Sequence, residues 1–201
     1  MDTWVWVVIV IAAIVIVALA TAMITGRRRT ERLQGRFGPE YDRTVEEADG
    51  RRAAERELTE REKRRAELDI RPLAPGARDR YAEEWRVVQQ HFVDDPNAAI
   101  GEADALVTRV MRDRGYPTDD FEQRAADVSV DHPDVVGHYR EAHDISLRND
   151  RGDVSTEHLR QAMVHYRALF EDLLESDDAA GVATDDSRLR RTRDSEIETP
   201  R

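Results

Sequence analysis

Histidine is the side chain through which this sequence could most directly carry out chemistry. His132, His138 and His143 lie close together in the chain and have aspartates and glutamates around them. Histidine and carboxylate side chains bind zinc and related metal ions. However, His138 and His143 are five positions apart, which is about 140° around a helix, so one helix face cannot direct both toward the same ion. The spacing therefore favours solvated or capping histidines, and we predict no metal site.

A metal-assisted hydrolase centred on His132, His138 and His143 stays open as an alternative function. His143 is followed by Asp144, and this pair resembles the His-Asp dipeptide of metal-dependent phosphohydrolases. The sequence does not place the further ligands that those enzymes require.

Other catalytic patterns are missing from the sequence. There is no cysteine, no glycine-rich phosphate loop, no nucleophile elbow, no HExxH motif and no Glu-x-x-His pair. His91 and His165 each stand beside an aromatic residue, which is typical of histidines half-buried against a core. We therefore predict no catalytic residue and no cofactor, and we expect a protein that is not an enzyme.

The charge distribution argues against nucleic acid as a partner. The chain carries 42 acidic and 31 basic residues, a net charge of −11. Residues 72–176 alone hold 22 acidic and 12 basic side chains. An acidic domain repels phosphate backbones, so a protein partner is the better expectation.

The N-terminal segment has the composition of a membrane anchor. Thr3 to Thr25 contains no charged residue and is rich in Val, Ile and Ala. As a helix it would extend about 34 Å, enough to cross a hydrocarbon core of about 30 Å. Its flanks fit the same interpretation, because tryptophans favour one interface and arginines mark the cytoplasmic end. These flanking residues are Trp4, Trp6, Arg27, Arg28 and Arg29.

A cleaved signal peptide is the competing interpretation of this segment. Ala18-Leu19-Ala20 resembles a cleavage site, but the first residues lack a positive charge and the apolar run exceeds the usual length. We expect a retained anchor in the bacterial cell membrane. The arginines after the anchor put the N-terminus outside and the rest of the chain in the cytoplasm.

The remaining sequence predicts an all-α protein in four parts. These are the transmembrane anchor (1–26), a charged juxtamembrane helical segment (27–71), an acidic bundle of four to five short helices (72–176) and a disordered tail (177–201). Asp95-Pro96 predicts a helix start and Gly115 its end. Leu159, Met163, Tyr166, Phe170 and Leu173 give the clearest amphipathic spacing.

A narrow apolar stripe lies in the juxtamembrane segment. Phe37, Tyr41 and Val45 follow one another at intervals of four, with a helix break predicted at Gly38-Pro39. An apolar face of this kind marks a contact. Three candidates for its cover remain open: the bundle, a second copy of the chain, or a protein partner.

Several short stretches resemble a family of uncharacterised bacterial membrane-anchored helical proteins. The first stretch runs from Arg36 to Val45 and contains FGPEYDRTV. The others are FVDDP, RGYP, FEQRAAD and MVHYR. The resemblance implies a single-pass helical protein and transfers no activity. We therefore predict a membrane-tethered interaction module, with a self-associating structural membrane protein as a further alternative.

Overall fold

The computed structural model is all-helical over the residues that it describes, with no strand among them. It describes residues 3–175, apart from part of the side chains between positions 3 and 22. The expected tail, 177–201, lies outside the described residues, as does the side chain of Trp6. The prediction of an all-α chain is confirmed.

The chain divides into two compact units, Met1–Thr59 and Glu60–Arg201. The division falls inside a helix, α3 (Arg51–Glu67). It does not fall in the linker, the non-helical residues 69–74 that separate α3 from the next helix. The side chains of α3 explain this position, because its last turns are bound to the second unit.

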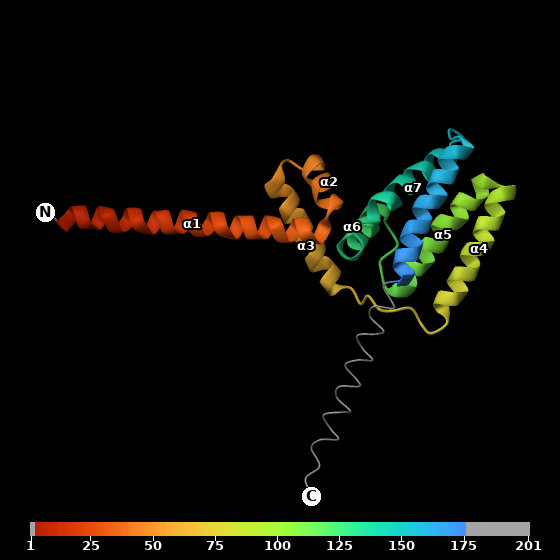
Figure 1. The fold of residues 1–201 in the computed structure, drawn as a ribbon, viewed down its shortest axis with the longest axis horizontal. Coiled ribbons are helices and arrows are strands. Elements are labelled where there is room, and N and C mark those ends of the chain that lie inside the picture. Colours follow the sequence, from red (N-terminus) through yellow and green to blue (C-terminus); the bar gives the residue numbers. More distant parts are fainter. Residues whose placement is uncertain (1–2, 176–201) are drawn as a thin grey trace, which may run out of the picture. The chain divides into compact units, whose positions relative to one another are not determined.

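The first unit contains α1 (Thr3–Phe37), α2 (Pro39–Glu47) and the beginning of α3 (Figure 1). Helix α1 continues without a break past Gly26 and the arginines that follow it. It ends where Gly38 adopts a φ of 46°, and Pro39 begins α2 with its ring-fixed φ. The predicted break at Gly38-Pro39 is confirmed.

Among the residues that the structure describes, no helix is both long enough and apolar enough to cross a membrane.

A small core of its own holds the first unit together. Leu33, Phe37 and Tyr41 are buried, and so are Ala54 and Leu58 on α3. Polar contacts converge on Glu55 of α3. Its carboxylate Oε1 accepts hydrogen bonds from the Thr30 hydroxyl at 2.6 Å and from the Tyr41 hydroxyl at 3.2 Å. The three helices are therefore tied together at one carboxylate.

The second unit is a helical bundle built on α4 (Ala77–Asp94), α5 (Pro96–Arg114), α6 (Phe121–Asp131), α7 (Val136–Asn149) and a last helix over residues 156–175 (Figure 1). Two helices start at the carboxylate caps that such positions favour. Asp95 accepts a hydrogen bond from the Ala98 backbone N–H, and Asp120 accepts one from Gln123. The predicted bounds of α5, with its cap at Asp95 and its end at Gly115, are confirmed.

One continuous apolar core fills the bundle. The five residues of the last helix that we predicted to point inward are all buried, and Phe170 stacks on Trp85 of α4 with ring centroids 4.8 Å apart. On α7, Leu147 is 43% exposed. Ile145 is buried instead. Two positions along a helix are about 200° apart, so Ile145 and Leu147 cannot share a face.

The C-terminal half of α3 is attached to the bundle through α6. The Arg64 guanidinium donates to the Asp127 carboxylate at 3.1 Å, and the Asp127 side chain is only 1% exposed. Arg65 pairs with Asp131, which also accepts a hydrogen bond from the Tyr116 hydroxyl. Arg61 is buried and donates to the hydroxyl of Ser129 at 3.4 Å. These three arginines therefore hold the end of α3 against α6.

Candidate metal-binding cluster

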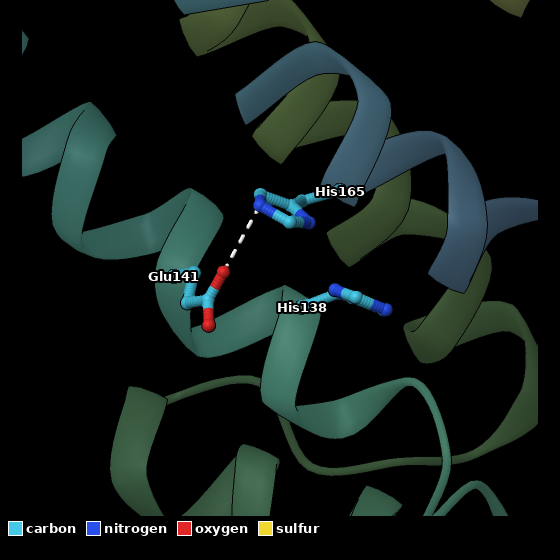
Figure 2. Close-up of side chains that lie close together, drawn as sticks. All are labelled: His138, Glu141 and His165. Carbon is cyan, nitrogen blue, oxygen red and sulfur yellow. Dashed lines mark ion pairs between the residues drawn. The ribbon is translucent and has the colours of Figure 1, made fainter. Parts of the chain in front are cut away.

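The residues best placed to bind a ligand are His138 and Glu141 on α7 and His165 on the last helix (Figure 2). His138 and Glu141 are three positions apart, so they lie on one face of α7. The last helix packs against α7 and brings His165 to that face, as the neighbouring contact between the Tyr139 and Tyr166 rings shows. One nitrogen or oxygen from each of the three side chains falls within 4.8 Å of the other two.

The closest contact joins His165 to Glu141. The ring nitrogen Nε2 lies 3.0 Å from the carboxylate oxygen Oε2. The same nitrogen lies 3.0 Å from the side-chain nitrogen of Gln161. A neutral ring nitrogen either donates or accepts, so it cannot donate to the carboxylate and accept from the amide together. The nitrogen is therefore shared between a negative oxygen and an amide whose orientation is set by the hydrogen-bond network.

The two histidine rings are stacked. Their centroids are 4.7 Å apart and their planes differ by 18°. The three side chains differ in exposure, because His165 is buried while His138 and Glu141 are exposed. The cluster therefore has one fixed member and two members that can turn toward solvent.

Burial controls the charge state of His165. It lowers the pKa of the imidazole, and the nearby His138 acts in the same direction, whereas the Glu141 carboxylate opposes both. The net direction is downward, so a neutral imidazole with a free lone pair is favoured. That is the form in which histidine binds a metal ion.

The other two histidines of the expected group lie elsewhere. His132 is buried and pairs with Asp172 of the last helix through Nδ1. His143 stacks on Phe121 with centroids 3.6 Å apart, and burial lowers its pKa. The structure therefore does not bring His132, His138 and His143 together; it pairs His138 with His165.

The predicted contact stripe lies inside the first unit. Phe37 and Tyr41 are buried and Val45 is half-buried. Tyr41 donates a hydrogen bond to Glu55 of α3, and Ala54 and Leu58 of that helix are buried in the same unit. The cover of the stripe is thus a helix of the same chain, which the spacing alone had not suggested.

The residues that flank the predicted anchor lie toward the two ends of the apolar part of α1. Trp4 is exposed, and Arg27, Arg28 and Arg29 are exposed one after another. Arg29 donates to the Glu55 carbonyl at 3.0 Å and to the Thr59 hydroxyl at 2.8 Å. At least one arginine of this group therefore has a structural role besides any role in topology.

The cluster was missed in the sequence because its members are far apart in the chain. His138 and His165 are 27 positions apart, and no helical spacing rule applies across a loop. The His-x-x-Glu pair of His138 and Glu141 was visible and places two ligands on one face. That pair is the signal that could have drawn attention to the site.

No family model, curated protein or solved structure matches this chain. The resemblance to bacterial membrane-anchored proteins therefore stays a prediction.

Proposed function

We propose that this protein is a membrane-tethered, non-enzymatic interaction module, anchored by the apolar part of α1 with its acidic bundle in the cytoplasm. The observation that carries the proposal is the apolar surface of α1. Seven large side chains of the uncharged run are more than half exposed between positions 11 and 24; they are Ile11, Ile14, Ile16, Val17, Leu19, Met23 and Ile24. Among the residues that the structure describes, no core covers these side chains.

The energy of this exposure supports a membrane as the missing environment. Removing a large aliphatic side chain from water gains about 1.5–3 kcal/mol, so seven of them are worth on the order of 10 kcal/mol. The side chains at positions 5–10 lie outside the described residues, and all six are apolar in the sequence. Its 23 uncharged residues are followed directly by Gly26 and three arginines.

The bundle supports the interaction part of the proposal. Residues 72–176 have ten more acidic than basic side chains. Two valines of α4 are exposed beside this charge, Val87 at 55% and Val93 at 81%. A recess of about 320 Å³ lies next to Val87 and is lined by Glu84, Glu102 and Arg109. An exposed valine beside two glutamates, as at Val87, fits a basic, partly apolar protein surface.

Membrane extraction tests the anchor. We expect the full chain to stay in the membrane fraction after washing at alkaline pH. The double variant Ile14→Asp, Val17→Asp should be released, because each aspartate costs about 2.5–3.5 kcal/mol near the centre of a spanning helix. The matched control Ile14→Leu, Val17→Leu should stay in the membrane. Release of the unchanged chain would rule out the anchor.

Site-specific photo-crosslinking in cells tests the interaction. A photoreactive amino acid at Val87 should give a discrete adduct heavier than the 23.1 kDa chain, and a Glu84→Arg, Glu102→Arg change in the same recess should weaken it. The control position is Leu147 on α7, which is also exposed. Adducts of equal strength at both positions would show that contact at Val87 is unspecific and would contradict the proposal.

A further inference from the structure

We infer that His138, Glu141 and His165 form a binding site for a divalent transition-metal ion of the zinc class, with water in the fourth position. Two imidazoles and one carboxylate are a donor set that zinc uses in open, three-ligand sites. This inference does not depend on the membrane anchor or on a protein partner.

The distances support a site that needs only a small adjustment. With bonds of 2.0–2.1 Å, the donor atoms of a tetrahedral zinc site are about 3.3 Å apart. His165 Nε2 and Glu141 Oε2 are already 3.0 Å apart. All three donor atoms fall within 4.8 Å of one another, so His138 has to approach by at most roughly 1.5 Å to complete the set.

The movement required is a rotation of the His138 ring. Ligand lone pairs lie in the plane of an imidazole, so two stacked parallel rings cannot point at one ion between them. His138 is exposed on α7 and can turn without displacing core side chains, whereas His165 is buried and already faces Glu141 (Figure 2). Metal binding would thus replace the stacked contact with two nitrogen bonds.

The surroundings favour a cation. The bundle carries a net charge of −10 between residues 72 and 176, which attracts positive ions. The side-chain nitrogen of Gln161 lies 3.0 Å from the Nε2 atom of His165, where its N–H can donate a hydrogen bond to the oxygen of a metal-bound water. The exposure of His138 and Glu141 leaves the fourth position of the ion open to solvent.

The test uses the full chain in detergent and titrates it with Zn²⁺ in competition with a chromophoric chelator. We expect one Zn²⁺ per chain. Co²⁺ in place of Zn²⁺ should give the intense visible absorption of a four-coordinate site. His138→Gln and Glu141→Gln should each weaken Zn²⁺ binding by more than the ~10–100-fold that loss of a second-shell partner causes.

His158→Gln is the matched control, because His158 is an exposed histidine of the same helix as His165 and contacts only Ser155 among the described residues. Its Zn²⁺ affinity should equal that of the unchanged chain. Since His138 and Glu141 are exposed, their variants should fold, which circular dichroism would verify. The inference is overturned if the unchanged chain binds no Zn²⁺, or if His138→Gln and Glu141→Gln bind it as tightly as His158→Gln.

Discussion

Gly115 joins two segments that are distant in the chain. It ends α5 with a φ of +99°, a region that side chains other than glycine rarely adopt. A Cβ atom at this position would overlap the carbonyl oxygen of Asp69, in the linker before the bundle. The backbone N–H of Arg71 also donates to the Arg114 carbonyl at 2.9 Å. The absence of a side chain at Gly115 is therefore what lets the linker pack against the end of α5.

We predict that Gly115→Ala destabilises the bundle by about 1–3 kcal/mol, since it adds backbone strain to a steric overlap. Gly101→Ala is the control, because Gly101 is exposed within α5 and a Cβ there has open space. That change should stabilise by up to about 1 kcal/mol. Chemical denaturation of both variants checks the pair. Equal effects at both positions would contradict the packing argument.

His91 shows how one carboxylate sets the charge of a surface group. Its ring nitrogen Nδ1 lies 2.9 Å from Glu102, and this hydrogen bond raises the pKa of His91 above its usual value. A raised folded-state pKa means that protonation stabilises the fold. That contribution is fully present below the unfolded pKa of about 6.5, and it is lost as the pH rises through the folded value.

We therefore expect Glu102→Gln to lower the pKa of His91 toward 6.5, measured by NMR titration of the imidazole protons. An unchanged pKa of His91 would mean that the pair with Glu102 does not persist in solution.

At the scale of elements, the sequence predicted a helix correctly where a capping residue or the spacing of apolar residues determines it. The Asp95 cap, the Gly115 end and the spacing of the last helix each depend on residues within one or two turns. The signals failed where a partner came from elsewhere in the chain. Nothing in the sequence around Arg64 and Arg65 indicates their partners, because Asp127 and Asp131 lie more than 60 positions away.

The same limit applies to the apolar stripe and to the histidines. The spacing of Phe37 and Tyr41 correctly indicated a buried face, but not that α3 would cover it. His165 is buried as its position beside Tyr166 suggested, while its contact with His138 depends on how two helices are packed. The spacing of residues within one helix does not indicate which other helix will pack against it.

Asp127 anchors the end of α3, and its removal should loosen that element selectively. We predict that Asp127→Ala costs about 1–3 kcal/mol, because the Arg64 contact and the hydrogen bond from Gln123 are both lost. Hydrogen exchange should quicken in residues 60–67 before it does in α5. The control Glu60→Ala removes only an exposed pair with Lys63 and should change stability by less than about 0.5 kcal/mol. Uniformly faster exchange across the bundle would contradict a selective anchor.

At the scale of the whole molecule, the two units differ in what they offer to their surroundings. The first unit has a long helix on which the described apolar side chains between positions 11 and 24 are exposed. The second has a continuous apolar core and an excess of acidic side chains. The proposed tethered module requires this contrast, because a membrane stabilises an apolar helix while a bundle with a buried core is suited to water.

The most direct test of this account is a topology measurement in intact cells with a membrane-impermeant maleimide. The chain has no native cysteine, so single cysteines report cleanly. Val93→Cys, at a position 81% exposed in the bundle, should be protected until lysis, while Asp2→Cys should be labelled in intact cells. Labelling of Val93→Cys with protection of Asp2→Cys, or equal labelling of both, would contradict a membrane-tethered bundle in the cytoplasm.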